Sequence, residues 1–212
     1  MDWADIFVIY DDVQYTKRDW RSRNRIKTQS GPLWLSVPVL SKDRRGQLIS
    51  EAMIVYDTAW NLKHAESISA AYARARYFQD YFPSIKEILG KNHKYLIDLN
   101  MELIVCFKDV LNIKANIVYS SALKVDGNST ERLVNICVEL GAREYLSGDA
   151  GRNYIEEDQF MERGIKVKYH NYKHPEYPQL FGGFVPHLSV VDLLFNCGPE
   201  SLDYLTGKRE LR

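Results

Sequence analysis

The alternation of strand-like and helix-like segments after Ala115 is the feature that most constrains the fold. A β-branched run, Ala115 to Ser121, is followed by the helical pattern of Ser129 to Ala142 and by a short apolar run, Glu144 to Ser147. A second helical pattern then leads to another short run, Ile165 to His170. Strands that alternate with helices in this way form βαβ units, whose strands lie parallel in one sheet.

The rest of the chain adds further strands and helices. We expect strands at Ile6–Tyr10, Leu33–Leu40 and Glu51–Asp57, and helices at Trp60–Tyr77, Tyr81–Leu89, Asn92–Leu111 and Glu156–Arg163, with one or two more from residue 185 to about 205. The second and third strands form either a hairpin or an excursion from a larger sheet. At 212 residues without repeats or a long linker, the chain predicts a single α/β domain: a mostly parallel, Rossmann-like sheet flanked by helices.

Composition excludes several classes of protein. The formal net charge is zero, whereas a general nucleic-acid binder carries a large excess of Lys and Arg. No apolar run reaches the length of a membrane span, and Met1 does not open a signal peptide. The three cysteines, Cys106, Cys137 and Cys197, are far apart and lie in apolar helical contexts. We therefore expect buried, reduced thiols in a cytoplasmic protein that does not bind membranes.

A dense cationic segment follows the first strand. The strand stops at two carboxylates, Asp11 and Asp12, and the next stretch holds six cations within eleven positions: Lys17, Arg18, Arg21, Arg23, Arg25 and Lys27. So many cations in a chain of zero net charge favour an anionic ligand, because arginine binds phosphate or carboxylate through paired hydrogen bonds. The alternative is a solvated basic face, which charge runs usually form.

Three loops are predicted to meet at the carboxyl edge of the parallel sheet, where open α/β folds bind ligands. They are the cationic segment, the glycine-containing loop after Ser147, and the aromatic, proline-rich loop from His170 to Phe184. Together they predict a site for a phosphorylated, ring-bearing molecule such as a nucleotide-sugar. Its expected binding residues are Gln14, Tyr15, Lys17, Arg18, Trp20, Arg23, Asn24, Arg25, Lys27, Ser147, Gly148, Gly151, Arg152, Asn153, Tyr177 and Gln179.

The same edge offers groups for acid–base chemistry. His64 and His174 are candidate general bases, since an imidazole titrates near neutral pH. Asp11 or Asp12 would orient such a base or hold a divalent cation. The sequence carries no zinc-ligand spacing, no Walker A motif and no G-x-S-x-G elbow, so we predict no dedicated metal site and leave the cofactor open.

Four strings of the sequence resemble the bacterial WbqC-like protein family in order and spacing. They are DDVQYTKRDWRSRNRIKTQSGPLWLSVPV, WNLKHAESISAAYARARYF, YLSGDAGRNYI and HPEYPQLFGGFVPHLSVVDLLFNCGPES. The family is associated with O-antigen and other surface-polysaccharide gene clusters, so the resemblance implies a cytoplasmic role in modifying nucleotide-sugars or amino sugars. A weaker similarity links the first strand to the HUP-type nucleotide-binding folds of pantothenate synthetase and its relatives, as a fold analogy only.

Two functional hypotheses follow. The first is an enzyme that transfers an acyl or related group from an activated donor to a nucleotide-activated amino sugar. The second is a non-catalytic protein that binds nucleotide-sugars and presents them to partner enzymes. The resemblance also implies an additional strand and helix before Met1, with a Q-P-x-Y-x-P-W-x-G-Y-like segment that this sequence lacks. We therefore expect an incomplete copy of the domain, which would cover its exposed edge by forming a homodimer or be less stable.

Overall fold

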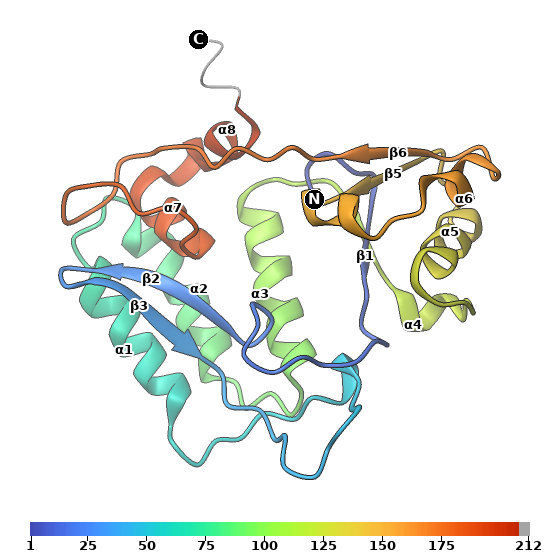
Figure 1. The fold of residues 1–212 in the computed structure, drawn as a ribbon. Coiled ribbons are helices and arrows are strands. Elements are labelled where there is room, and N and C mark those ends of the chain that lie inside the picture. Colours follow the sequence, from blue (N-terminus) through green and yellow to red (C-terminus); the bar gives the residue numbers. More distant parts are fainter. Residues whose placement is uncertain (208–212) are drawn as a thin grey trace. The chain divides into compact units, whose positions relative to one another are not determined.

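The computed structural model describes residues 1–207 and shows a mixed α/β protein with short parallel strand pairs flanked by helices (Figure 1). The chain clusters into two compact units. Unit 1 contains Met1–Asp12 and Lys114–Lys173, and unit 2 contains Val13–Ile113 and His174–Arg212. The α/β class is thus confirmed, while the Rossmann-like topology and the single domain stay predictions.

Unit 1 contains both parallel strand pairs. Strand β1 (Ile6–Ile9) pairs with β4 (Asn116–Tyr119), and β5 (Glu144–Ser147) pairs with β6 (Lys166–Tyr169). A βαβ connection joins β5 and β6 through the short helix α6 (Glu157–Met161). Strands β4 and β5, which the sequence placed in one βαβ unit, belong to different pairs.

The helices of unit 1 cover these strands with a small apolar core. Helix α4 (Ser120–Leu123) follows β4 directly, and α5 (Ser129–Glu139) ends where Gly141 takes a positive φ of 62°. The η2 turn (Asp149–Asn153) follows β5. The buried core comprises Val134, Cys137, Phe160 and Ile165, and Tyr145 of β5 stacks on Phe160 with 4.9 Å between the ring centres.

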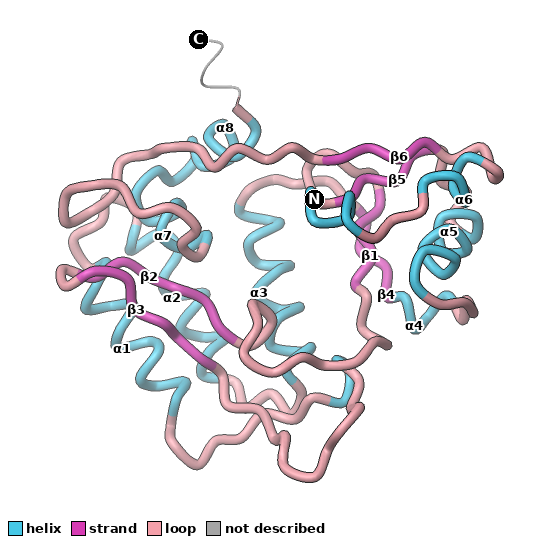
Figure 2. The backbone as a smooth tube through the Cα atoms, viewed as in Figure 1, coloured by secondary structure: helices cyan, strands magenta, loops and turns pink. Residues whose placement is uncertain are grey.

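Unit 2 combines an antiparallel hairpin with a set of helices. Strands β2 (Arg23–Thr28) and β3 (Gly31–Ser36) form the hairpin, and a 3-10 turn, η1 (Ile49–Glu51), follows. The long helices are α1 (Trp60–Tyr72), α2 (Phe78–Gly90) and α3 (Leu96–Val110). After the loop that Figure 2 shows between β6 and α7, the chain ends in α7 (Val190–Cys197), η3 (Gly198–Glu200) and α8 (Ser201–Thr206).

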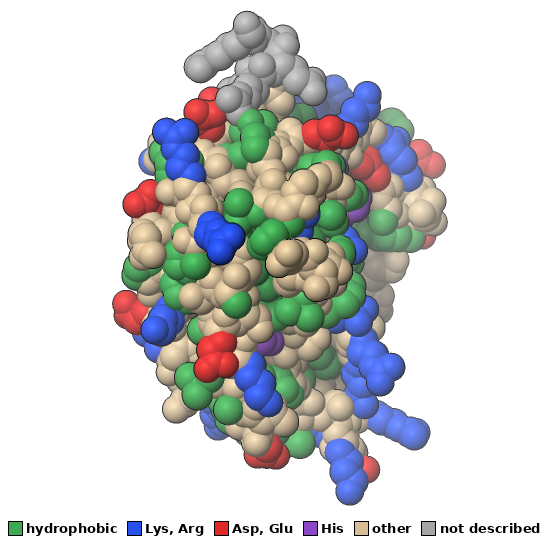
Figure 3. Space-filling view, turned by 90° about the vertical axis from the view of Figure 1, so that its left-hand side faces the viewer, with side chains coloured by type: hydrophobic (Ala, Val, Ile, Leu, Met, Phe, Trp, Pro, Cys, Tyr) green, Lys and Arg blue, Asp and Glu red, His purple; other side chains and the backbone are tan. Residues whose placement is uncertain are grey.

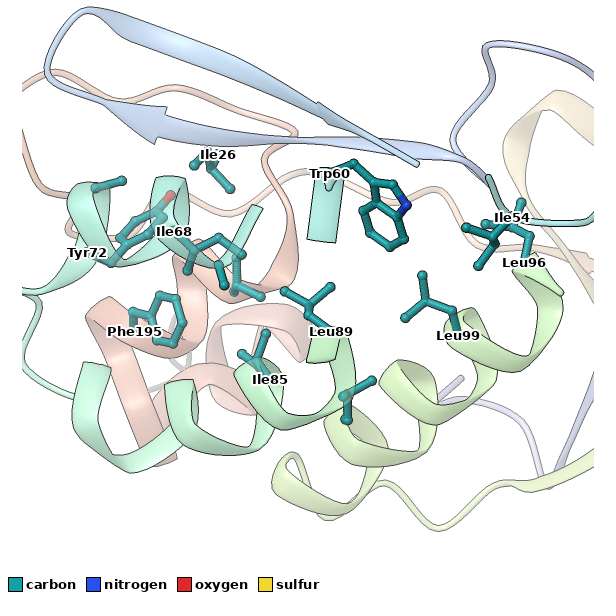
Figure 4. Packing of buried hydrophobic residues seen from close by; sticks show 14 of the residues in the cluster. Ile26, Ile54, Trp60, Ile68, Tyr72, Ile85, Leu89, Leu96, Leu99 and Phe195 are labelled. Carbon is teal, nitrogen blue, oxygen red and sulfur yellow. The ribbon is translucent and has the colours of Figure 1, made fainter. Parts of the chain in front are cut away.

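The main core of unit 2 lies between the hairpin and its helices. Figure 4 shows Ile26 of β2 directed toward Ile68 and Tyr72 of α1, with Phe195 of α7 beside them. Ile26 is 1% exposed and Tyr72 is fully buried. Complete burial of an aliphatic side chain of this size contributes roughly 1.5–3 kcal/mol. The hairpin is therefore held by its apolar face, and the other face is available for other contacts.

Three predicted elements differ from the structure. Half of the cationic segment, expected as a loop, is strand β2. The strand expected at Glu51–Asp57 is absent from the described residues, since Ile54 and Val55 donate their N–H groups to different segments, Lys94 and Pro38. Helix α2 begins earlier than predicted, so that Pro83 lies inside it and not in its first turn.

Two further features bear on the predicted class of protein. Among the described residues, none of the helices has both the length and the apolar character needed to cross a lipid bilayer. The three cysteines are free thiols: Cys137 and Cys197 are buried and Cys106 is half-buried. Burial raises the pKa of Cys137 to about 11, so this thiol is held in its protonated form.

Candidate functional site

The predicted site residues are divided between the two units. Unit 1 holds Asp11, Asp12, Ser147, Gly148, Gly151, Arg152 and Asn153, and unit 2 holds Gln14, Tyr15, Lys17, Arg18, Trp20, Arg23, Asn24, Arg25, Lys27, His64, His174, Tyr177 and Gln179. A single site that joins all of them stays a prediction. Each unit has its own arrangement of these side chains, and the two arrangements differ in what they leave open to a ligand.

In unit 2 the hairpin presents cations and tryptophans on one face. Side chains alternate along a strand, so Arg23 and Arg25 project from the face opposite to Ile26. Trp34 of β3 lies directly across from Arg25 in the register and shares this face. Trp20 packs against Trp34 with 5.3 Å between the ring centres. We call Trp20, Arg23, Arg25 and Trp34 the cation–tryptophan face.

The two arginines of this face are held differently. Arg23 lies flat over Trp34, 4.3 Å from its guanidinium carbon to the ring centre, and has no ion pair with any acidic residue that the structure describes. Arg25 donates hydrogen bonds to the carbonyl oxygens of Pro186 and His187, at 3.2 and 3.1 Å. The N–H donors of Arg23 are therefore available to a ligand, whereas some of the N–H donors of Arg25 are bonded to the protein.

The tryptophans of this face remain accessible. Trp20 is 60% exposed and Trp34 is 42% exposed, although large aromatic rings usually lie mostly buried. An exposed indole beside a guanidinium offers a surface on which a planar ring can stack. On the side of the molecule drawn in Figure 3, Lys and Arg side chains line the lower right edge and also occur among the hydrophobic and acidic groups of the rest of the face.

Lys27, at the far end of the same strand, has a structural environment. Its side chain is buried, and the ammonium group donates to Gln179 Oε1 and to the carbonyl oxygens of Gly182 and Gly183, at 3.2, 2.7 and 2.5 Å. These three acceptors satisfy its three N–H donors. Gln179 in turn hydrogen-bonds to both backbone groups of Val185. Lys27 and Gln179, both predicted to bind substrate, thus fix the loop from residue 179 to 185.

A buried carboxylate, Asp192, lies beside the residues that hold this loop. The Tyr72 hydroxyl donates to Asp192 Oδ2 at 2.7 Å and accepts the backbone N–H of Lys27 at 2.8 Å. The Tyr177 hydroxyl lies near Asp192 and, like that of Tyr72, favours its charged form. Burial raises the pKa of Asp192 above the ordinary value of an aspartate, with the two tyrosines opposing that shift. Tyr177, a predicted ligand contact, belongs to this buried network.

Both histidines proposed as bases are engaged within unit 2. Burial lowers the pKa of His64 to about 4, so its imidazole is neutral and weakly basic near pH 7. His174 accepts the backbone N–H of His187 at Nε2, and its Nδ1 lies 2.9 Å from the Pro175 carbonyl oxygen. Since Nε2 accepts, Nδ1 carries the proton. Burial also lowers the pKa of His174.

The remaining predicted residues of unit 2 lie along the entry to the hairpin. Tyr15 is in the core, so the stacking role proposed for it or Trp20 is open only to Trp20. Lys17 donates to the Ser41 carbonyl oxygen at 3.3 Å. Asn24 accepts the backbone N–H of Arg25, and Gln14 forms an isolated bridge with Leu48. Arg18 is exposed, with a positive φ of 58°.

In unit 1 the two carboxylates after β1 accept hydrogen bonds from protein groups. Asp11 is 4% exposed and accepts three hydrogen bonds, from the hydroxyls of Ser120 and Ser121 and from the N–H of Ser121. Asp12 accepts the Ser120 hydroxyl at 2.6 Å and pairs with Arg132. Burial alone would raise the pKa of Asp12, but the bonds from Ser120 and Arg132 outweigh it and hold that pKa below its ordinary value.

The polar side chains of the loop after Ser147 are likewise bonded to protein groups. Asp149 accepts the backbone N–H groups of Asn171 and Tyr172, at 2.9 and 3.3 Å. Arg152 lies over the Tyr169 ring at 3.9 Å and donates to Asn171. Paired glycines in a short loop predict that Gly148 or Gly151 adopts a backbone conformation that a Cβ disfavours. This prediction is wrong, since Gly148 has a φ of −67° and neither glycine has a positive φ.

Packing explains one of these glycines. A Cβ on Gly151 would lie 2.1 Å from Ser147 Oγ and 2.7 Å from Ile155 Cδ1, whereas a Cβ on Gly148 would meet open space. Asn153 ends the η2 turn and is exposed. In the described part of the chain, no cluster of three or more His, Cys, Asp or Glu side chains is arranged to hold a metal ion.

The sequence interpretation missed several residues that shape these sites. Trp34 follows from the hairpin register, which places it opposite Arg25. Asp192 is a carboxylate within the apolar string VVDLLF, a pattern that signals a buried polar network. Arg132 and Ser120 come from α5 and α4, and nothing in their local sequence links them to Asp12.

Comparison with known proteins places the chain in a family. The model of the WbqC-like protein family matches residues 1–204. The chain belongs to the WbqC-like family. It is 41% identical over 210 residues to the uncharacterized protein Rv1507c of Mycobacterium tuberculosis, an alignment that covers 98% of this chain and 90% of that protein. No solved structure matches the chain significantly.

Proposed function

We propose that this WbqC-like protein binds a nucleotide-activated sugar at the cation–tryptophan face and serves bacterial surface-polysaccharide biosynthesis. The observation that carries the proposal is Arg23, which lies over an exposed tryptophan and has no acidic partner among the described residues. A diphosphate supplies the anion that such a guanidinium lacks. A nucleobase supplies the planar ring that Trp20 and Trp34 would stack on.

The protein groups around Arg23 favour a preformed site. Arg25 is fixed by the carbonyl oxygens of Pro186 and His187, and the backbone N–H of Ser189 donates to the Arg25 carbonyl at 2.8 Å. The loop that supplies these groups is itself fixed by Lys27 and Gln179. Little conformational entropy would therefore be lost from the protein on binding, which strengthens affinity.

The test is calorimetric titration with UDP-N-acetylglucosamine, GDP-mannose, UDP and uridine. We expect Arg23→Ala to weaken binding of the nucleotide-sugar by roughly 10- to 100-fold, since a charged hydrogen bond contributes about 1.5–3 kcal/mol. Arg76→Ala is the matched control, because Arg76 also lies over an aromatic ring, that of Tyr77 at 5.1 Å, but outside this face. Equal affinity in both variants would return the segment to a solvated basic face.

Arg25→Ala is a less clean test than Arg23→Ala. Its guanidinium holds two carbonyl oxygens, and its Nε is buried without a partner among the described residues. We therefore expect Arg25→Ala to lower both affinity and stability. A melting temperature measured beside each titration separates the two effects.

Group transfer to an amino sugar is a second candidate, favoured by the family resemblance and by His187. This imidazole is exposed, stands edge-on to His174 with 4.9 Å between the ring centres, and belongs to the residue whose carbonyl accepts from Arg25. It is thus an accessible acid–base group beside the proposed phosphate site, whereas His64 and His174 are engaged. The amino-sugar nucleotide is incubated with acyl-coenzyme A donors, and His187→Ala should abolish product while leaving nucleotide-sugar binding intact. Binding without product in the unmodified protein would favour the non-catalytic role.

A further inference from the structure

Unit 2 contains a pocket that the proposed function does not use. It has a volume of about 460 Å³ and is lined by Arg44, Arg45, Gly46, Gln47, Ser50, Glu51, Met53 and Tyr95. The volume falls within the roughly 300–1,000 Å³ typical of small-ligand sites. None of its lining residues belongs to the cation–tryptophan face.

The floor of the pocket holds an unsatisfied acceptor. Gln47 is 8% exposed, and its Nε2 donates to the Leu40 carbonyl oxygen at 3.2 Å, which fixes the orientation of the amide. Its Oε1 is buried and accepts no hydrogen bond from any residue that the structure describes. This oxygen is closed to solvent, so a ligand hydroxyl or amine would reach it only after the neighbouring side chains shift. A buried acceptor without a partner costs about 1–3 kcal/mol, which favours such a shift when a donor is bound.

The rim of the pocket is net cationic. Arg44 and Arg45 are exposed, and neither forms an ion pair with an acidic side chain in the described chain. The one carboxylate of the lining, Glu51, accepts the backbone N–H of Leu48 at 3.0 Å. Two guanidinium groups against one carboxylate favour a ligand with a single anionic group, bound through paired hydrogen bonds.

The walls are fixed by backbone contacts and carry an aromatic ring. Met53 pairs with Tyr95 in an isolated bridge, and the backbone N–H of Tyr15 donates to the Gln47 carbonyl at 2.9 Å. Tyr95 precedes helix α3, and its ring is half-buried. The Lys94 ammonium lies over one face of this ring, 5.0 Å from its centre, so the other face is the one that can pack against the C–H face of a sugar ring.

From these features we infer that the pocket binds a monosaccharide that carries one anionic group. Arg44 with Arg45 binds the anion, Tyr95 packs against the C–H face, and Gln47 Oε1 accepts a ring hydroxyl once the side chains that cover it have shifted. The anion is a phosphate or a carboxylate, which the arginines recognise in the same way. This site is separate from the cation–tryptophan face, so the inference does not rest on the proposed nucleotide-sugar binding.

The experiment is calorimetric titration of the whole chain with glucose 1-phosphate and glucuronic acid, against glucose and inorganic phosphate. We expect at least one anionic sugar to bind roughly 10-fold or more tightly than either control. The double variant Arg44→Ala/Arg45→Ala should weaken that binding by roughly 10- to 100-fold, and Gln47→Leu by roughly 10-fold. Lys42→Ala, an exposed cation of the same turn outside the lining, should change nothing.

Three outcomes would overturn the inference. In the first, neither anionic sugar binds at millimolar concentration. In the second, all variants bind the sugar with equal affinity. In the third, inorganic phosphate binds as tightly as the sugars. If Gln47→Leu melts early, the double arginine variant still decides, because both of its side chains are exposed. Arg23→Ala should leave this binding unchanged, so failure here and failure of the nucleotide-sugar proposal are told apart.

Discussion

The end of β1 in unit 1 and the cation–tryptophan face in unit 2 are both rich in charge, yet they use it differently. After β1, Asp11 accepts three hydrogen bonds and Asp12 accepts from Ser120 and pairs with Arg132. On the hairpin, Arg23 rests on an indole ring and has no acidic partner in the described chain. The first region stabilises the fold, and the second keeps capacity for a ligand.

This difference shows what a cluster of charges does and does not indicate. Both places are marked by charged residues in the sequence, but the partners supplied by distant segments decide which charges stay available. Ser120 and Arg132 reach Asp12 from positions 108 and 120 residues away along the chain. Side chains whose hydrogen-bond donors have no partner in the protein are therefore better candidates for ligand binding than regions of high charge density.

The largest expected effect is on Asp11. Asp11→Ala removes the acceptor of two hydroxyls and one backbone N–H at a site that is 4% exposed. We expect the free energy of unfolding to fall by roughly 2–4 kcal/mol. Urea denaturation followed by circular dichroism measures it. Arg23→Ala serves as the comparison, with an expected change within about 0.5 kcal/mol. If both variants lost a similar free energy of unfolding, the two regions would not differ in their contribution to stability.

Gly151 tests whether the loop after β5 belongs with the closed region. Gly151→Ala places a Cβ against Ser147 Oγ and Ile155 Cδ1, and we expect a destabilisation of roughly 1–3 kcal/mol from overpacking. Gly148→Ala is the matched control, because its Cβ would meet open space and its φ of −67° suits alanine. A Gly148→Ala variant that lost as much stability as Gly151→Ala would contradict the packing account. Nucleotide-sugar binding should be unchanged in both variants.

The third effect concerns the pH dependence of unit 2 and vanishes at neutral pH. The pKa of His64 falls from 6.5 to about 4 on folding, so the unfolded chain binds more protons in this interval. The stability contributed by neutral His64 is full above about pH 6.5 and is lost as the pH falls toward 4, at most about 1.4 kcal/mol per pH unit. His64→Gln should flatten this dependence in urea titrations at about pH 7 and about pH 5. An unchanged slope would show that His64 titrates normally in the fold.

Local sequence patterns predicted most helices and the strands of unit 1, since periodicity and glycine stops act over a few residues. Strand β5 has the predicted bounds, and Gly141 ends α5 as expected. The pattern failed where tertiary contacts decide the structure. Arg23 to Thr28 is polar and cationic by composition, and it becomes a strand because β3 pairs with it and Ile26 is buried against α1.

The sequence predicted the cations of the candidate site but not the residues that contact them. Arg23 and Trp20 are visible as an unusual local string, whereas Trp34 requires the hairpin register. The burial of Lys27 could not be foreseen, because its acceptors lie in Gln179, Gly182 and Gly183. Whether a lysine binds phosphate or carbonyl oxygens is decided by such long-range contacts.

The contacts of Lys27 also bear on the order in which the protein is made. Its ammonium group meets the Gly182 carbonyl 155 residues later in the sequence. During synthesis, β2 and β3 leave the ribosome long before that partner exists, and contacts of such sequence separation form slowly. Until then the lysine stays hydrated, on the strand face opposite to Ile26. The loop from residue 179 to 185 is therefore expected to close over this face of the hairpin only near the end of translation, although the hairpin is among the first segments to emerge.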